Sequence, residues 1–109
     1  MELTIAIAVT DAGRHTITLG GAIDMQSCPD LVSAGRAAVD AAGCSEIVLN
    51  LADVTFMDSI GIGAIVQLAG NATDAGLAFR LQDPSPRVMR ILELTGLQNA
   101  WTIESVDTA

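Results

Sequence analysis

The residues with the clearest chemical potential lie in one run, LADVTFMDSIGIGAI, which spans positions 51–65. This pattern is typical of the end of a buried strand, a short loop, and a helix that begins near Ser59. Asp58 is a suitable N-cap, so the Ser59 hydroxyl is not needed to cap the helix. A phosphate on that hydroxyl would lie beside free backbone N–H groups at the positive end of the helix dipole. We therefore interpret Ser59 as the modifiable group of a docking surface.

Two glycines follow the serine within the predicted helix. Gly61 and Gly63 each cost about 1 kcal/mol of helix stability relative to alanine. One interpretation is that they leave bare backbone exposed to a partner. The other is that they allow close packing against a neighbouring strand or helix. Both interpretations stay open from the sequence.

Enzymatic chemistry at this run is disfavoured. A serine nucleophile needs a base, and the single histidine, His15, is expected to be a solvated strand residue. A dinucleotide-binding fingerprint would need a third glycine at the position of Val66. No His/Cys cluster has metal-ligand spacing, so we predict no catalytic residue, no metal and no cofactor. Nucleotide binding at the start of the helix stays open, although the motif contains no basic residue to hold phosphates.

Composition narrows the possible partners. The chain has 109 residues, half of them hydrophobic, and we treat residues 1–109 as a single domain. Its net charge is −8 and all five basic residues are arginine, which argues against nucleic acid and anionic membrane surfaces. No apolar stretch is long enough to span a bilayer and no signal-peptide pattern is present, so we predict a cytoplasmic protein. Cys28 and Cys44 are expected to be free thiols, because they lie near opposite ends of one predicted helix.

The elements that must position Ser59 alternate between strand and helix. A capping-box-like pair, Ser27 and Asp30, is expected to open the first helix. The predicted strands are apolar on one side and carry polar residues on the other, which indicates that the helices cover mainly one face of the sheet. The fold class is α/β, with a single mixed sheet of four to five strands that starts with an antiparallel hairpin. Strands are predicted at Leu3–Val9, His15–Leu19, Glu46–Leu51, Leu77–Leu81 and Trp101–Ile103, and helices start near Ser27, Ser59 and Ser85 and end at Gly43, Gly76 and Gly96.

Two expectations concern apolar residues outside the helices. Trp101 is expected to be half-buried in the core. We also expect a monomer, because no long exposed apolar stripe remains once the core is assigned.

Beyond these local patterns, the chain resembles the STAS-domain proteins, specifically the single-domain bacterial anti-sigma factor antagonists. The resemblance covers nearly the whole chain, and its central motif is specific. It is carried by GAID at 21–24, LNL at 49–51, VTFMDS at 54–59, GIG at 61–63 and LTGL at 94–97.

The resemblance implies the STAS fold and a partner-switching function. The serine that matches Ser59 is phosphorylated in the family by an anti-sigma factor, which is a serine kinase of the GHKL type. The unmodified antagonist binds this anti-sigma factor and releases a sigma factor, and a PP2C-type phosphatase restores binding after phosphorylation. Asp24 matches an aspartate beside that serine. The implied partner-binding residues are Asp24, Thr55, Met57, Asp58, Ser59, Ile60, Gly61, Ile62 and Gly63.

Three positions depart from the usual family pattern. Ala22 stands where glutamate is common, Asn50 where aspartate is frequent, and Ile60 where a second serine is common. The first two remove negative charge, which would alter partner choice. An alternative within the same family is a STAS subunit of a larger assembly, such as a stressosome-like or lipid-transport complex, that docks through the same surface.

Overall fold

The alternating pattern of the sequence folds into one sheet flanked by three helices. The computed structural model describes residues 2–105. The sheet has five strands in the order β1-β2-β3-β4-β5, with β1 and β2 antiparallel and the remaining neighbours parallel. The predicted α/β class, mixed sheet and N-terminal hairpin are therefore confirmed. The elements are β1 (Leu3–Val9), β2 (Arg14–Ile23), α1 (Cys28–Asp40), β3 (Glu46–Met57), α2 (Ser59–Asp74), β4 (Ala78–Gln82), α3 (Pro86–Thr95) and β5 (Thr102–Glu104).

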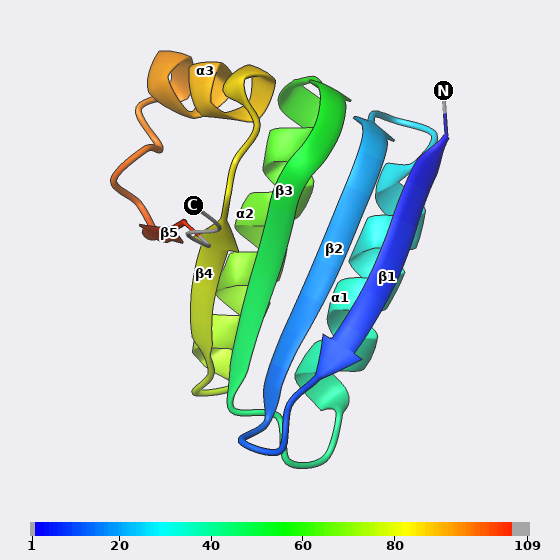
Figure 1. Ribbon diagram of the computed structural model, residues 1–109, viewed down its shortest axis with the longest axis vertical. Helices are drawn as coiled ribbons and strands as arrows, with labels where there is room; N and C mark the ends of the chain where they lie inside the picture. Colours follow the sequence, from blue (N-terminus) through cyan, green and yellow to red (C-terminus); the bar gives the residue numbers. More distant parts are fainter. Residues whose placement is uncertain (1, 106–109) are drawn as a thin grey trace.

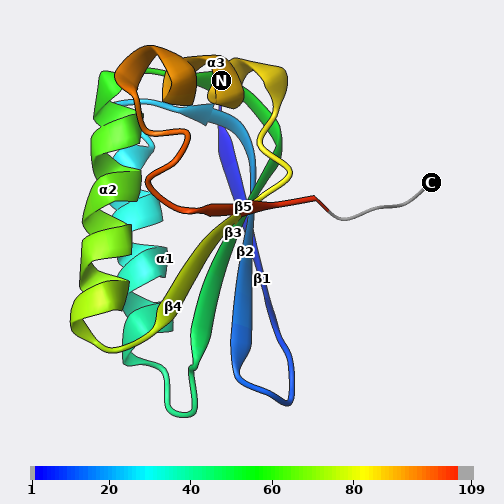
Figure 2. The ribbon, with the colours of Figure 1, turned by 90° about the vertical axis from the view of Figure 1, so that its left-hand side faces the viewer.

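The helices are arranged asymmetrically around the sheet. Figures 1 and 2 show α1 and α2 side by side against one face, while α3 lies across the end of the sheet where β3 finishes. The core lies between the sheet and these two helices, and α1 packs so closely on α2 that a Cβ at Gly35 would lie 2.6 Å from Leu68 Cδ1. The prediction that the helices cover mainly one face is confirmed. No helix of residues 2–105 is long and apolar enough to cross a membrane.

Strand β3 is longer than the sequence pattern predicts. The segment 52–57, expected to be a loop, continues the strand as far as Met57. It does so because β2 stays paired with it through two register shifts, which place Gly21 opposite Val54 and Ile23 opposite Met57. Gly21 has φ +92°, a backbone conformation that favours glycine. The register shifts around Gly20 and Gly21 are therefore bulges that extend the pairing toward α2.

The predicted cap of α1 is wrong. Ser27 has helical backbone angles and its side chain makes no capping hydrogen bond to the helix. Its hydroxyl instead donates to the Ala22 carbonyl oxygen at 2.8 Å and accepts from the Asp24 N–H at 2.9 Å. Ser27 therefore ties the beginning of α1 to the end of β2.

The predicted environment of His15 is also wrong. His15 is only 6% exposed, because it shares the helix-facing side of β2 with Ile17 and Leu19. Its Nδ1 lies 3.3 Å from the Gly13 carbonyl oxygen. A side chain held in this way is a structural residue of the core edge.

The predicted ends of α3 and the environment of the aromatic residue match the structure, whereas α1 ends at Asp40, before the stop predicted at Gly43. Ser85 caps α3 by accepting from the Val88 N–H at 3.3 Å, and Gly96 ends that helix at φ +75°. Trp101 is half-buried and packs edge-on against Phe79, with 5.9 Å between the ring centroids.

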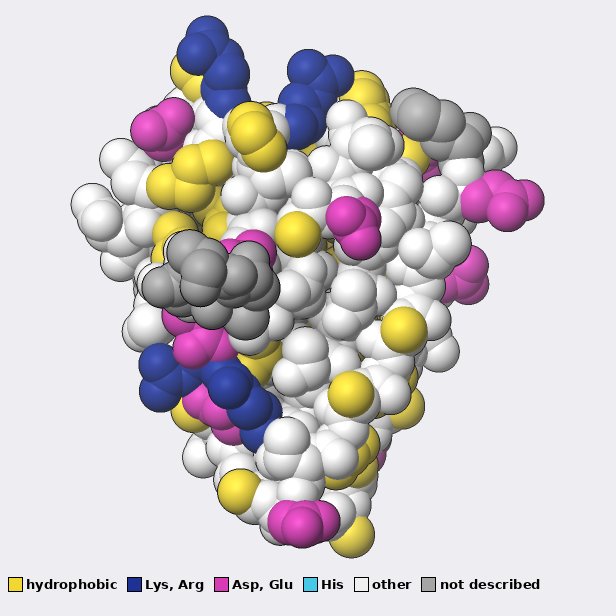
Figure 3. Space-filling model, in the orientation of Figure 1, with side chains coloured by type: hydrophobic (Ala, Val, Ile, Leu, Met, Phe, Trp, Pro, Cys, Tyr) yellow, Lys and Arg dark blue, Asp and Glu magenta, His cyan; other side chains and the backbone are white. Residues whose placement is uncertain are grey.

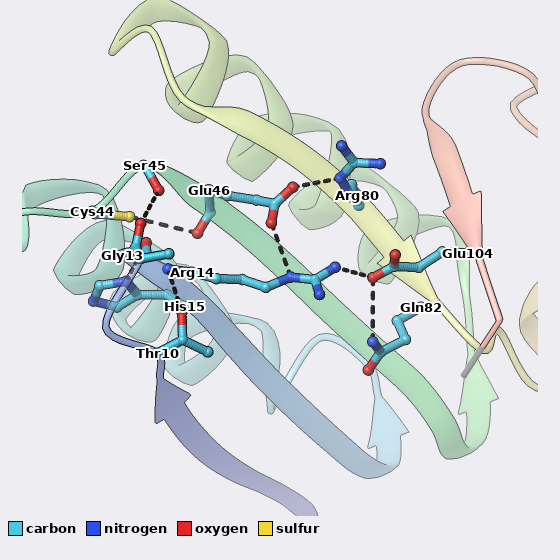
Figure 4. Close-up of polar contacts among 11 residues, drawn as sticks. Thr10, Gly13, Arg14, His15, Cys44, Ser45, Glu46, Arg80, Gln82 and Glu104 are labelled. Carbon is cyan, nitrogen blue, oxygen red and sulfur yellow. Dashed lines mark hydrogen bonds and ion pairs between the residues drawn. The ribbon is translucent and has the colours of Figure 1, made fainter. Parts of the chain in front are cut away.

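A polar network crosses the face of the sheet that carries no helix. Glu46 on β3 pairs with Arg14 on β2 and with Arg80 on β4, and Arg14 also pairs with Glu104 on β5 (Figure 4). The hydrogen bond and charge of Glu46 raise the pKa of the Arg80 guanidinium. Gln82 joins the network by donating to Glu104 at 3.2 Å. Four strands are thereby linked through their side chains, and the short β5 is tied to the sheet.

Candidate functional site

The hydroxyl of Ser59 lies at the surface, on the first residue of α2. Asp58 precedes it with extended backbone angles, and its Oδ1 accepts from the Gly61 N–H at 3.0 Å. Asp58 is therefore the N-cap, as predicted, and the serine oxygen is not used for capping. The predicted exposed hydroxyl at the beginning of the second helix is confirmed.

The two glycines of α2 have different environments. A Cβ on Gly61 would lie 2.7 Å from the Ile23 carbonyl oxygen and 2.8 Å from Met57 Cγ. A Cβ on Gly63 would meet nothing within 4 Å. Close packing therefore explains Gly61, which lets the first turn of α2 approach the end of β2. Gly63 is exposed, and packing does not account for it.

Asp24 lies in the turn that joins β2 to α1, immediately after Ile23. Its Oδ1 accepts from the N–H groups of Gln26 and Ser27, each at 3.0 Å. The hydrogen bond from the Ser27 backbone is the main reason that the pKa of Asp24 is lowered from its ordinary value of 3.8. Asp24 is therefore anionic at neutral pH and is held in one orientation beside the first turn of α2.

Beneath this turn lies the thiol of Cys28. Burial raises the pKa of this thiol, and the negative charges of Asp58 and Asp24 raise it further. Both carboxylates therefore act on the same buried group, although they come from segments far apart in the sequence. The site is negative, and Cys28 is protonated at neutral pH.

The predicted partner-binding residues separate by exposure. Met57 and Ile62 are 3% and 7% exposed, and their side chains pack in the core. Together with Gly61 they hold the first turn of α2 in place and have little surface to offer a partner. The members with surface to offer are Asp24, Thr55, Asp58, Ser59, Ile60 and Gly63.

One exposed apolar residue of this region was missed from the sequence. Met25 is 69% exposed and follows Asp24 in the turn after Ile23, the residue of β2 that lies against Gly61. Ile60, beside the serine, is 47% exposed. A large apolar residue in a turn between a strand and a helix was the available signal. We define the docking surface as Asp24, Met25, Thr55, Asp58, Ser59, Ile60 and Gly63.

Charges of both signs border the docking surface. A depression of about 280 Å³ beside Asp24 is lined by Glu2, Asp24 and Asp30, together with Leu3, Gln26 and Ser27. On α3, the Arg87 guanidinium lies 5.5 Å from the ring centroid of Phe56, near the end of β3. Figure 3 shows basic side chains projecting at the end of the molecule where α3 lies. Within residues 2–105, no group of three His, Cys, Asp or Glu side chains is placed to hold a metal ion.

Two of the three departures from the family pattern have intramolecular explanations. Ala22 is fully buried, so its side chain presents no surface to a partner. The Asn50 amide nitrogen donates to Gln82 Oε1 at 2.8 Å on the helix-free face of the sheet. A carboxylate at that position could not donate this bond.

Thiol reactivity tests the burial of Cys28 under the site. Both cysteines are free, and Cys44 is half-buried whereas Cys28 is 7% exposed. Alkylation of the native protein with iodoacetamide is expected to modify Cys44 at least about 10-fold faster than Cys28, because the thiolate is the reacting form and access is required. Peptide mass spectrometry over time measures the two rates. The difference should disappear in denaturant, and equal rates in the native state would contradict this description of the site.

Comparison with known proteins assigns the class. A family model described as "Mlab, STAS domain" matches residues 7–104. A protein of Bacillus subtilis named anti-sigma-B factor antagonist is 30% identical over 93 residues, which cover 82% of this chain and 80% of that protein. The chain spans about half the length of the Thermotoga relatives it matches, with 38% identity over 55 residues and 49% of each relative covered. This chain belongs to the STAS-domain family.

Solved structures agree on the fold. The anti-sigma factor antagonist SpoIIAA in its unphosphorylated form superposes with a TM-score of 0.80 at 20% identity, covering 95% of this chain and 90% of that one. SpoIIAA of Bacillus in its phosphorylated form gives a TM-score of 0.75 at 19% identity, covering 95% and 93%. At this identity the likeness shows a shared fold, and the STAS fold expected from the sequence is confirmed.

Proposed function

We propose that this protein is an anti-sigma factor antagonist that works as a phosphorylation-controlled partner switch. The docking surface binds an anti-sigma factor, a serine kinase of the GHKL type, and so releases a sigma factor. Phosphorylation of Ser59 by that kinase ends the binding, and a PP2C-type phosphatase restores it. The supporting observation is the exposed Ser59 hydroxyl at the first residue of α2, in a chain whose relatives carry the name of antagonists.

The local chemistry suits such a switch. A phosphate adds about −1.5 to −2 charges at neutral pH, and the start of α2 can accommodate it without unfolding. The added charge lies beside Asp58 and close to Asp24, so the docking surface becomes more negative and bulkier while the scaffold stays intact. The proposal assigns the protein no catalytic role. Its partners belong to transcription control, so it also places the protein in the cytoplasm.

The carboxylates around Asp24 indicate the chemistry of the partner. One depression beside the docking surface is lined by the carboxylates of Glu2, Asp24 and Asp30. The exposed apolar residues of the docking surface itself are Met25 and Ile60. A complementary partner therefore presents basic side chains next to an apolar contact.

Phosphorylation by candidate kinases tests the proposal. The full chain is incubated with each anti-sigma factor of the same genome and ATP, and intact mass and peptide mapping are recorded. We expect one added phosphate on Ser59, none on the Ser59→Ala variant, and an unchanged yield with Thr55→Ala, since Thr55 is the nearest other hydroxyl. An unmodified Ser59 with every candidate would overturn the proposal.

A second candidate function is a STAS subunit of a larger assembly. It is favoured by the matching family model, whose description names Mlab rather than an antagonist. The same docking surface would then bind a protein that is not a kinase. Neighbouring genes distinguish the two: an anti-sigma kinase gene supports the switch, and a permease gene supports the assembly subunit.

A further inference from the structure

The outer edge of the sheet on the β1 side has no partner strand among the described residues. Strand β1 pairs with β2 over seven residues, from Leu3 opposite Gly21 to Val9 opposite His15. Figures 1 and 2 show it as the outermost strand, on the side away from β4 and β5. An unpaired strand edge of this kind presents a row of free backbone N–H and C=O groups.

The hairpin shows which backbone groups of β1 point outward. The Thr10 N–H donates to the Arg14 carbonyl oxygen at 3.0 Å, so Thr10 and Arg14 form a hydrogen-bonded pair. Hydrogen-bonded and non-hydrogen-bonded pairs alternate in an antiparallel ladder. The backbone groups of Thr4, Ala6 and Ala8 therefore point toward β2. Those of Leu3, Ile5, Ile7 and Val9 point outward.

The side chains along this edge are uncharged, and all except that of Thr4 are apolar. Ile7 and Val9 are 49% and 59% exposed, whereas Leu3 and Ile5 in the first half of the strand are half-buried. The reason for expecting a monomer, that no apolar stripe remains exposed, fails at these two residues. No charged residue occurs between Glu2 and Asp11, in a chain of net charge −8.

The two edges of the sheet are protected differently. Strand β5, at the other edge, has only three residues, and one of them is Glu104, an ion-pair partner of Arg14. Short length and charge are the usual protections of an edge strand, together with proline and bulges. Strand β1 has seven residues and none of these protections.

We propose that two copies of this chain associate through β1, in an antiparallel pair with its two-fold axis at Ala6. In this register Leu3 lies opposite Val9 and Ile5 lies opposite Ile7, so all seven residues of each strand are paired. The outward N–H and C=O groups of these four residues then bond to each other across the axis. The two sheets become one continuous sheet.

The same register suits the side chains. Residues opposite each other point to the same face, so exposed Ile7 and Val9 meet Ile5 and Leu3 of the second copy. At the axis, Ala6 faces its own copy in a non-hydrogen-bonded pair, where a small side chain is suitable. Glu2 lies opposite Thr10, so no like charges face each other along the pair.

Sedimentation velocity of the full chain tests the association. A single strand pair is a small interface, so we expect a reversible dimer at roughly 100 μM rather than a permanent one. Ile7→Lys is expected to weaken the association by at least about 10-fold, because each dimer would carry two charges within the apolar strip. Leu94→Lys is the matched control, since Leu94 is an exposed apolar residue (72%) on α3. Far-UV circular dichroism checks that both variants fold.

Cysteine cross-linking tests the register independently, in a background with Cys28→Ala and Cys44→Ser. The thiols of Ala6→Cys would face each other across the axis at a Cα separation of about 4.5 Å, which permits a disulfide. Those of Ala8→Cys would lie about 14 Å apart along the strands, at about 3.4 Å per residue. We expect mild oxidation to cross-link the first variant and leave the second monomeric. A chain that stays monomeric, a dimer insensitive to Ile7→Lys, or equal cross-linking of both variants would overturn the proposal.

Discussion

Replacing Ser59 with aspartate is expected to weaken binding to the anti-sigma factor by about 100-fold, which corresponds to about 2.7 kcal/mol. Ser59→Ala is expected to bind as tightly as the unmodified chain. The prediction rests on the proposed function. The serine is exposed between Asp58 and Ile60, so a carboxylate there places charge and bulk where a partner fits a small hydroxyl. A carboxylate in the first turn of α2 also interacts favourably with the helix dipole, by about 0.3–1 kcal/mol. Folded stability should therefore stay level or rise while binding falls.

Isothermal titration with the purified anti-sigma factor measures the two affinities. Ala42→Asp is the control for net charge, because Ala42 is exposed just beyond the far end of α1, about 20 Å of helix from the docking surface. This variant adds the same single charge and is expected to bind normally. Equal affinities for Ser59→Ala and Ser59→Asp would contradict the switch, whatever the stability of the two proteins.

The parts of the fold that the sequence predicted correctly depend on short-range signals. Asp58 and Ser85 each accept a hydrogen bond from an N–H three residues later, and Gly96 ends its helix with a positive φ. Such interactions are complete within one helical turn, so the local sequence specifies them. The position of Ser59 was predictable for the same reason.

The errors concern contacts that a residue makes outside the strand or helix in which the sequence pattern places it. Strand β3 reaches Met57 because the bulges of β2 keep the two strands paired, and a pattern read along β3 alone does not contain that information. His15 is buried because of how the helices cover β2. Ser27 bonds to the Ala22 carbonyl oxygen instead of capping its own helix. In each case tertiary structure determined a local choice that the sequence left open.

The same distinction applies to the candidate site. Sequence identified Ser59 and Asp58, but it could not separate Gly61 from Gly63, because both are glycines at neighbouring positions of one helix. Only the approach of Ile23 and Met57 to Gly61 distinguishes them. Substitution by alanine turns this structural difference into a measurable one.

Gly61→Ala is expected to lower the free energy of unfolding by about 1–2 kcal/mol. Its new methyl group would lie 2.7 Å from the Ile23 carbonyl oxygen, a backbone atom that cannot move without displacing β2. Overpacking costs about 1–3 kcal/mol, and a contact this short with a backbone atom belongs to the upper part of that range, so the cost exceeds the gain of about 1 kcal/mol in helix propensity. Urea denaturation at equilibrium measures the change. An unchanged or higher stability would mean that α2 does not approach β2 as described.

Gly63→Ala should have the opposite effect on stability, because its methyl group would point into open space. We expect a gain of up to about 1 kcal/mol. Gly70→Ala is the matched control, since Gly70 is also an open position of α2 but lies about 10 Å further along the helix. If bare backbone at Gly63 contacts the anti-sigma factor, Gly63→Ala will weaken binding while Gly70→Ala leaves it unchanged, although both stabilise the chain. Equal binding by the two variants would show that Gly63 is not part of the docking surface, and that its lack of a side chain plays no role in recognition.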